Sequence, residues 1–452
     1  MPVTPRTPPG VLELLPAEQI AHQRMLDTIR RGFERFGFLP VETPVFELSD
    51  VLLTKSGGET EKQVYFVQST GSLKQGGTPE LALRFDLTVP LARYVAEHEP
   101  KLNFPFRRYQ IQRVYRGERA QKGRYREFYQ CDIDVIGKDR LSTNYDAELP
   151  AVIYGVFTEL GFGKFTIYLN NRRLLRGLLE SLGVAVDRHA AVLHEIDRLD
   201  KIGHAQVVER LVAEAGLAAP TAEKLIGIVT VPELAQALTE LKALATGNDM
   251  LSTGLTELEA VYQGALDLGV PADSLKINLA IARGLDYYTG TVYETFLDAH
   301  RELGSICSGG RYDDLASHYT KSKLPGVGIS IGATRLFSKL LELGALPKGA
   351  SSIAQVIVLR VEAALAAEYA AIAKDLRAAG HAVDVYGDDD KLGKQLKYGD
   401  RAKIPLAIIY GSREKDAGIV KIKDLRVGEG KAPEYDVPRA ELVEAVRRLL
   451  AT

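Results

Sequence analysis

Tryptophan is absent from the 452-residue sequence, methionine occurs three times and cysteine twice. Two cysteines cannot build a disulfide framework or a zinc site of their own, so we expect Cys131 and Cys307 to be small buried side chains and expect no protein-held metal. There is no run of about 18 apolar residues, and residues 1–10 have no apolar signal core. These absences predict a cytoplasmic protein without a membrane span.

Net charge is also nearly absent. The chain has 57 Lys and Arg against 59 Asp and Glu, which gives a formal net charge of −2. No overall field therefore attracts nucleic acid. The exception is residues 101–126, where nine basic residues accompany a single acid, Glu118. Because glycine, tyrosine and glutamine are interspersed in this run, we favour a basic loop at a site over an ordinary solvated face.

The periodicity of apolar residues divides the chain into segments of different type. Residues 1–171 mix helices and strands, residues 172–263 read as one helix after another, and residues 264–346 return to strands. Residues 347–352 have the composition of a linker, and residues 353–452 alternate strand with helix, which predicts a small parallel sheet. We therefore expect a divided first domain, a helical insertion and a separate C-terminal α/β domain.

A basic loop joins two segments with the pattern of antiparallel strands. These are residues 107–115 and 127–136, in which apolar and polar residues alternate. Since successive side chains of a strand point to opposite faces, Gln130, Asp132 and Asp134 share one face. A strand with such a polar row lines a site or faces water.

A second polar cluster is the octapeptide RGLDYYTG, residues 283–290. An arginine offers a planar fork of N–H donors that suits phosphate oxygens. Tyrosines supply flat apolar walls, each with one polar tip. The combination predicts a pocket that holds a phosphate-like anion beside a small polar ring.

These segments together resemble one known family. Residues 283–290 and 309–315 (GGRYDDL) resemble the two signatures of the histidyl-tRNA synthetases. Residues 37–46, 114–130 and 326–335 resemble motifs 1, 2 and 3 of class II aminoacyl-tRNA synthetases, in that order. The likeness covers nearly the whole chain. It implies an α+β catalytic domain built on an antiparallel sheet, a helical insertion and a C-terminal α/β anticodon-binding domain.

The resemblance also implies a reaction and its partners. Histidine and ATP would form histidyl-adenylate and pyrophosphate, and the histidyl group would then pass to the 3′ end of histidine tRNA. Because both reactants of the first step are anionic, we expect cationic side chains and Mg²⁺ around the phosphates. The residues that resemble the catalytic and ATP-binding groups of the family are Arg116, Arg283 and Arg335, with Glu118 and Arg124 as further ATP contacts. Motif 1 implies a homodimer.

Histidine recognition needs acceptors for an ammonium group and for ring N–H groups. Asp86 and Thr88 are expected at the amino group and Asp134 at the imidazole. The full set of residues expected to bind histidine is Asp86, Leu87, Thr88, Gln130, Asp134, Tyr287, Tyr288, Arg311 and Tyr312. None of the eight histidines falls in these motifs, so the base of the transfer step stays open between a substrate phosphate and a carboxylate.

Three other functions are compatible with parts of the sequence. The first is the regulatory, histidine-binding paralogue of ATP phosphoribosyltransferase, whose members generally lack the anticodon-binding domain and parts of the signatures. The others are a class II synthetase for another amino acid and an RNA-binding module with an inactive site. The presence of Arg116, Arg283 and Arg335 together with about a hundred C-terminal residues favours the histidyl-tRNA synthetase.

Overall fold

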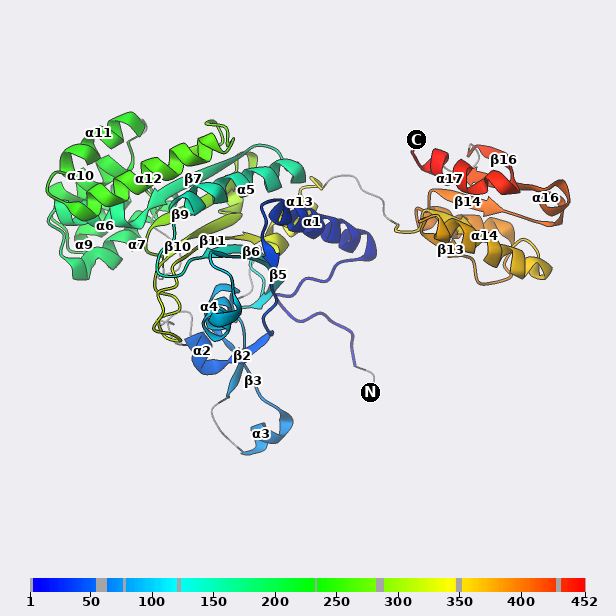
Figure 1. Cartoon of the computed structure of the whole chain (residues 1–452), viewed down its shortest axis with the longest axis horizontal. Helices are drawn as coiled ribbons and strands as arrows, with labels where there is room; N and C mark the ends of the chain where they lie inside the picture. The colour runs from blue at the N-terminus through cyan, green and yellow to red at the C-terminus, as the bar shows by residue number, and fades with distance from the viewer. Residues whose placement is uncertain are drawn as a thin grey trace. The chain divides into compact units, whose positions relative to one another are not determined.

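The computed structural model describes residues 3–53, 63–75, 79–119, 123–231, 234–281, 288–346, 352–427 and 432–451. The chain forms two compact units (Figure 1), Met1–Glu13 with Met25–Leu346, and Leu14–Arg24 with Pro347–Thr452. Among the described residues, no helix combines the length and the apolar character needed to cross a membrane.

The first unit is built on an eight-stranded sheet with the strand order β1-β5-β6-β11-β10-β9-β7-β8. The strands are β1 Leu39–Pro40, β5 Phe106–Tyr115, β6 Glu127–Ile136, β7 Phe165–Asn171, β8 Leu275–Ile277, β9 Thr291–Leu297, β10 Cys307–Tyr312 and β11 Gly326–Gly332. All neighbours from β5 to β7 are antiparallel, and only the two edge strands pair in parallel. The predicted antiparallel catalytic sheet is thus confirmed.

Helices cover one face of this sheet. Helix α5, Asn144–Leu160, packs on β10 and β11, and α13, Ala333–Glu342, packs on β6. The alternation of β6 explains the two faces, because Cys131, Ile133 and Val135 are fully buried while the polar residues between them point the other way. The face opposite α5 is therefore the one that is left for a site.

A small second sheet lies beside the first one in the same unit. Its order is β2-β4-β3, and all its neighbours are antiparallel. Its strands and the adjacent helices are β2 Phe46–Leu48, β3 Tyr65–Val67, β4 Leu81–Leu83, α2 Ser49–Leu53, α3 Thr70–Gln75 and α4 Thr88–His98. Of residues 37–46, which resemble motif 1, Leu39 and Pro40 form β1 and Phe46 begins β2.

The helical insertion begins directly after β7. Its helices are α6 Arg172–Ser181, α7 His189–Ile196, α8 Leu199–Ile202, α9 His204–Ala213, α10 Ala219–Val229, α11 Leu234–Leu244 and α12 Asp249–Asp267. Asn171 starts α6, since its side chain accepts a hydrogen bond from Arg173 N at 2.8 Å. Helices α6 and α12 cross closely at Gly254, where a Cβ atom would lie 2.2 Å from Leu174 N. The last helix extends four residues beyond the predicted boundary at residue 263.

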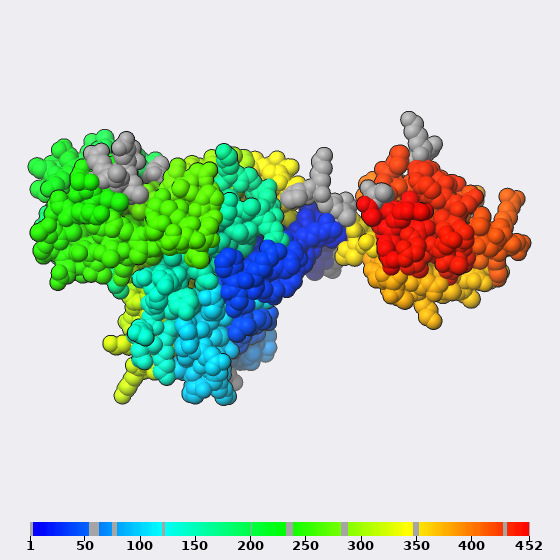
Figure 2. All heavy atoms as spheres, turned by 45° about the horizontal axis from the view of Figure 1, so that its top comes forward, coloured from blue at the N-terminus to red at the C-terminus, as the bar shows by residue number. Residues whose placement is uncertain are grey.

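The second unit has a five-stranded sheet with the order β13-β12-β14-β15-β16. Its elements are β12 Val356–Val358, α14 Ala366–Ala378, β13 Val383–Val385, α15 Leu392–Arg401, β14 Leu406–Ile409, α16 Ser412–Ala417, β15 Ile419–Asp424, β16 Glu434–Pro438 and α17 Leu442–Ala451. The predicted parallel sheet is right for β12, β13 and β14, which are joined by helical crossovers. It is wrong for β15 and β16, which pair antiparallel after shorter connections. In the space-filling view, the helical insertion is green and the sheet and helices of residues 352–451 run from gold through orange to red (Figure 2).

Candidate active site

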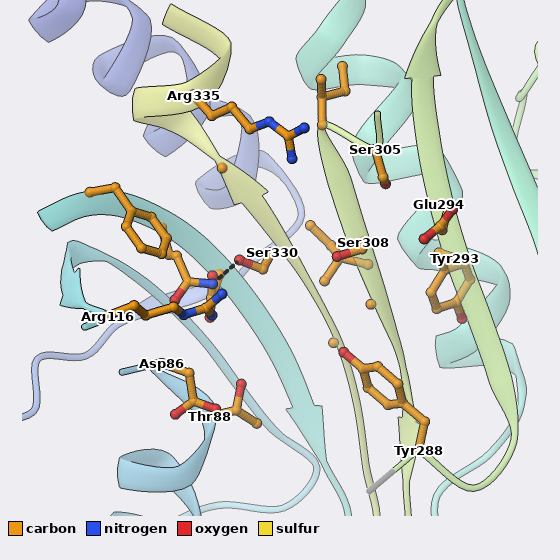
Figure 3. Close-up of a pocket in the computed structure, with 18 of the residues that line it drawn as sticks. Asp86, Thr88, Arg116, Tyr288, Tyr293, Glu294, Ser305, Ser308, Ser330 and Arg335 are labelled. Carbon is orange, nitrogen blue, oxygen red and sulfur yellow. Dashed lines mark hydrogen bonds between the residues drawn. The ribbon is translucent and has the colours of Figure 1, made fainter. Parts of the chain in front are cut away.

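A pocket of about 450 Å³ opens on the face of the large sheet opposite α5 (Figure 3). Strands β6, β9, β10 and β11 form its floor, and the start of α4, the loop after β5 and the start of α13 supply its walls. It brings together ten of the residues that were expected to bind substrates: Asp86, Thr88, Arg116, Glu118, Arg124, Gln130, Asp134, Tyr288, Tyr312 and Arg335. Two others, Arg283 and Tyr287, lie outside the described residues.

The register of the central strands creates the polar floor of the pocket. Asp134 on β6 lies opposite Arg108 on β5 and Gly328 on β11. Two residues earlier on β6, Asp132 lies opposite Gln110 on β5 and Ser330 on β11. Since residues directly opposite in an antiparallel pair share a face, all these side chains point to the pocket side.

Asp134 is held by one side chain from β5 and one from β10. Its Oδ2 lies 2.7 Å from Arg108 Nη2, and its Oδ1 accepts a hydrogen bond of 2.7 Å from the Tyr312 hydroxyl. Arg108 is fully buried. Burial raises the pKa of Asp134, and the charge of Arg108 and the hydrogen bond from Tyr312 act against that rise. The carboxylate is therefore fixed in orientation before any ligand binds.

The glycine opposite Asp134 makes room for its carboxylate. A Cβ atom on Gly328 would lie 2.2 Å from Asp134 Oδ1 and 2.5 Å from the carbonyl oxygen of Ile133. Backbone atoms cannot move aside as the end of a flexible side chain can, so only glycine fits here. Gly332, on the same strand, has no atom within 4 Å of its Cβ position.

We expect Gly328→Ala to lower the free energy of unfolding by about 1–3 kcal/mol, because the added methyl group is forced against the backbone of β6. Gly332→Ala is the matched control, and its cost should stay within about 1 kcal/mol. Urea unfolding followed by circular dichroism measures both. Equal midpoints for the two variants would show that β11 shifts to accept the methyl group.

Asp86 stands at the N-terminus of α4, at the other wall of the pocket. Its Oδ1 accepts a hydrogen bond of 3.1 Å from Val89 N, so the residue does cap the helix. Its Oδ2 is buried and has no hydrogen-bond partner among the described residues. Burial raises the pKa of Asp86 to about 6, against the hydrogen bond from Val89 and the charges of Arg116 and Arg108. A cap that uses one oxygen leaves the second one for a ligand.

Gln130 and Thr88 complete the polar wall between Asp86 and β11. The side-chain Nε2 of Gln130 donates to Ser330 Oγ at 2.9 Å, which the dashed line in Figure 3 marks. Its Oε1 is buried and has no partner in the described part of the chain. Thr88 points its side chain into the same region, next to Asp86 (Figure 3). This end of the pocket is rich in hydrogen-bond acceptors.

Two arginines bring positive charge to the pocket from different elements. Arg116 donates from Nε to the carbonyl oxygen of Phe85 at 3.0 Å, and its guanidinium carbon lies 5.1 Å from the centre of the Phe128 ring. Arg335 lies on the first turn of α13, and its guanidinium contacts the carbonyl of Leu303. Figure 3 shows Arg335 at the end of the pocket away from Asp86 and Tyr288, with Arg116 in between.

The expected loop contacts are also present at the pocket mouth. Glu118 and Arg124, which flank the undescribed residues 120–122, both line the pocket, and Arg124 Nη1 lies 3.4 Å from Glu118 Oε2. The Arg124 side chain is 66% exposed, so this ion pair holds it only weakly. A ligand phosphate could therefore replace Glu118 as its partner.

Arg311 and Leu87 do not line the pocket, which differs from the expectation for both. Strand alternation turns Arg311 toward α5, where its Nη2 lies 2.5 Å from Asp146 Oδ2 and its Nε 3.0 Å from Asp146 Oδ1. Arg311 is therefore a buried structural ion pair behind the sheet. The Leu87 side chain is fully buried, and its carbonyl oxygen lies 3.4 Å from Arg108 Nη2.

Sequence reasoning missed several polar groups of the pocket. Arg108 was counted only as part of the basic run, although the hairpin register places it opposite Asp134. Asp132 was placed on the correct strand face but was given no role. Ser330 and Glu294 carry no local signal, because β9 and β11 become neighbours of β6 and β10 only in the folded sheet.

Comparison with known proteins agrees with this geometry. The family model described as "Histidyl-tRNA synthetase" matches residues 10–336, and the model described as "Anticodon binding domain" matches residues 355–449. The first model alone covers more than two thirds of the chain. The chain belongs to the histidyl-tRNA synthetase family.

Individual relatives of this family match over almost the full length. A protein named histidine–tRNA ligase from Stenotrophomonas maltophilia is 58% identical, with 98% of each chain covered. One of the same name from Xanthomonas campestris pv. campestris is 56% identical, over 98% of this chain and 96% of the relative. The predicted histidine-specific aminoacyl-tRNA synthetase, an ATP-using ligase, is thereby confirmed.

Solved structures give the same family and fold. The crystal structure of histidyl-tRNA synthetase from Nostoc sp. PCC 7120 superimposes with a TM-score of 0.89 at 40% identity, covering 99% of this chain and all of the other. A structure titled ATP phosphoribosyltransferase regulatory subunit/histidyl-tRNA synthetase, from Bacillus halodurans C, has a TM-score of 0.73 at 23% identity over 88% of this chain and 97% of that chain. That second likeness concerns the fold alone, so the regulatory paralogue is less well supported.

Proposed function

We propose that the pocket activates L-histidine with ATP and then transfers the histidyl group to the 3′ end of histidine tRNA. The observation that carries the proposal is the separation of charge along the pocket. Buried carboxylates, Asp86 and Asp134, stand at one end, Arg335 stands at the other, and Arg116 lies between. The α-ammonium and ring N–H groups of histidine and the phosphates of ATP need these opposite environments at a fixed distance from each other.

In the activation step, an oxygen of the histidine carboxylate forms a bond to the α-phosphorus of ATP. The bond from that phosphorus to the bridging oxygen breaks, and pyrophosphate leaves with the electron pair, so no proton has to move. Arg116 lies where it can neutralise the α-phosphate, with Arg283 as its expected counterpart from the opposite side. Arg335, with Glu118 and Arg124 at the mouth, would hold the remaining phosphates and the nucleotide.

Histidine is read at the other end. Asp86, Thr88 and Gln130 accept from the α-ammonium group, and Asp134 accepts from a ring N–H. The aromatic walls are Tyr312 and Tyr288, with Tyr287 expected beside them. An analogue without ring N–H groups would leave the buried Asp134 short of a donor, which costs binding energy.

Mg²⁺ is proposed to enter with the nucleotide. Among the described residues, no group of three or more His, Cys, Asp or Glu side chains could hold a metal ion. Mg²⁺ keeps several waters and binds mainly through phosphates in nucleotide sites, so it needs no complete protein cage. Glu118 and Glu294, which both line the pocket, are the carboxylates that could contact its waters. When bound, the ion would add to the neutralisation of the phosphate charge.

The transfer step needs the tRNA. The 3′-terminal ribose hydroxyl attacks the carbonyl carbon of the adenylate, AMP leaves, and the hydroxyl proton passes to a base. The adenylate phosphate and a pocket carboxylate remain the two candidates for that base.

We propose that residues 353–452 bind the anticodon and that the enzyme works in the cytoplasm. The divisions at residues 171, 263 and 346 and the linker 347–352 are retained as proposed domain limits.

The direct test is histidine-dependent ATP–pyrophosphate exchange with the purified full chain, scanned over the twenty amino acids. Exchange with histidine alone supports the proposal. Exchange with another amino acid, or with none while histidine still binds, would overturn it in favour of another class II synthetase or the regulatory paralogue. Charging of histidine tRNA with labelled histidine then tests the second step.

We further propose that the enzyme is a homodimer. Phe46, Leu48 and Leu81 lie on one face of the small sheet and are 52%, 49% and 40% exposed. Contiguous exposed apolar side chains of this kind mark protein interfaces. Phe46 is the last residue of the motif 1 segment, 37–46, which supports a second copy of this chain as the partner.

We expect Phe46→Glu to convert the dimer to a monomer at micromolar concentration, because a buried, unpaired carboxylate opposes association. Light scattering coupled to gel filtration measures the mass, and we expect about half the wild-type value. Val186→Glu, at a residue of the helical insertion that is 73% exposed, is the control and should leave the mass unchanged. A monomeric wild-type protein would contradict the proposal.

A further inference from the structure

Three hydrogen-bond acceptor atoms that line the pocket are buried and have no donor among the described residues. Among the described residues, four buried side-chain oxygens lack a hydrogen-bond partner, and three of them line this pocket. They are Asp86 Oδ2, Gln130 Oε1 and Asp132 Oδ1. A buried acceptor without a donor costs about 1–3 kcal/mol, so three of them around one cavity indicate a ligand with several donors.

We propose that Asp132 binds the α-ammonium group of histidine together with Asp86 and Gln130. An ammonium group has three N–H donors and no acceptor, so it can supply the donors that Asp86, Gln130 and Asp132 lack, with the Thr88 hydroxyl as a further contact. The inference rests on the proposed binding of histidine in this pocket, and it adds to that site a residue for which the sequence motifs suggested no role.

The position of Asp132 supports this role. It lies between Gln130 and Asp134 on the same face of β6, about 6–7 Å along the strand from each. Asp132 is only 2% exposed, so the pocket and not bulk water is its environment. A ligand that spans the residues expected at the amino group and at the imidazole passes over it.

The charge balance of the pocket points the same way. Asp86, Asp132 and Asp134 are buried near one another, and Arg108 is the buried cation that acts on all three. Arg116 also acts on Asp86, but two guanidiniums cannot neutralise three carboxylates, so a cationic ligand is needed for all of them to ionise. Burial raises the pKa of Asp132 to about 7, while Arg108 and a hydrogen bond from Ser330 oppose the rise. The ammonium group of histidine supplies the missing positive charge.

If Asp132 had a purely structural role, its replacement would have different effects. Its strand neighbours Gln110 and Ser330 are polar, so it could serve only to satisfy them. In that case its replacement would disturb the sheet and affect every substrate alike. A role at the ammonium group affects only ligands that carry this group.

The experiment compares Asp132→Asn with wild type in ATP–pyrophosphate exchange. We expect the KM for histidine to rise about 10- to 100-fold, with the KM for ATP and kcat within about threefold, because an amide keeps the size but loses the charge. The inference is overturned by an unchanged KM for histidine, or by a parallel rise of both KM values with a lowered unfolding midpoint.

A competition measurement with two histidine analogues gives an independent readout. Histidinol keeps the ammonium group, whereas imidazolepropionate lacks it. Asp132→Asn should weaken inhibition by histidinol at least tenfold and leave inhibition by imidazolepropionate within about twofold. Equal changes for both analogues would overturn the role at the ammonium group. Exchange with histidine by the wild-type enzyme would still stand, so the failure of this inference is distinct from failure of the proposed function.

Discussion

Arg116→Ala should lower kcat for histidine-dependent ATP–pyrophosphate exchange by roughly a thousandfold, while histidine binding stays within about threefold. The reason is that Arg116 lies between Asp86 and Arg335, where we propose that the α-phosphate is bound and gains charge during the reaction. Preorganised cations at a transferring phosphoryl group are worth about 10³- to 10⁵-fold. Exchange kinetics and calorimetric titration with histidine separate the two effects.

Arg113 provides the matched control for this prediction. It lies on β5, three residues before Arg116, which follows the end of that strand. Its side chain is 51% exposed and pairs with Glu127 at 3.2 Å, away from the pocket. Arg113→Ala should change kcat by less than about threefold, since an exposed ion pair contributes little. If Arg116→Ala lowered kcat as little as Arg113→Ala does, Arg116 would not be the residue that neutralises the α-phosphate.

Local patterns predicted the elements that carry the site. The strand 127–136 is observed with the bounds that its alternation gave, because it is long and has a clear apolar face. The same alternation placed Gln130, Asp132 and Asp134 on one face. Predictions that depend only on the chain near a residue therefore succeeded.

Predictions that depend on which strands become neighbours were less successful. Arg311 and Tyr312, which follow two glycines in the second signature, were both expected in the pocket. Adjacent residues of a strand face opposite ways, however, and Arg311 pairs with Asp146 of α5. Strand β11 has an apolar residue at every second position, Val327, Ile329 and Ile331, but this alternation does not say that β11 lies between β6 and β10. Gly328 is explained only by Asp134 on the neighbouring strand. The positions of Arg311 and Gly328 relative to their contacts depend on how the strands pair, which the sequence of a single strand does not determine.

Arg108 shows most clearly how burial changes the meaning of a residue. In the sequence it is one of nine basic residues in a run, and in the structure it is fully buried against Asp134. A buried ion pair contributes little compared with a well-packed apolar pair, but loss of one partner leaves an uncompensated buried charge. Arg108 should therefore be needed chiefly because Asp134 is there.

We expect Arg108→Met to lower the free energy of unfolding by about 3–5 kcal/mol at pH 8, since Asp134 is then buried without its cation. Removal of Arg108 also raises the pKa of Asp134 further, because burial already raises it and Arg108 opposes that rise. In the folded Arg108→Met variant, the Asp134 carboxyl group therefore stays protonated to a higher pH than it does in the wild type. Its stability deficit is then smallest under acidic conditions and grows as the pH rises.

Urea unfolding at pH 5 and pH 8 tests this prediction with two further variants. Adding Asp134→Asn to Arg108→Met removes the buried charge, so it should recover part of the loss at pH 8 and less at pH 5. Arg113→Met, at a half-exposed ion pair, should cost less than about 1 kcal/mol at both pH values. A deficit of Arg108→Met that does not change with pH would mean that lost packing, and not the unpaired Asp134 carboxylate, sets its size. We propose that the ionised Asp134 carboxylate also accepts a hydrogen bond from a ring N–H of histidine. A stability deficit that grows with pH would therefore show that Arg108 stabilises the same ionised form of Asp134 that binds histidine.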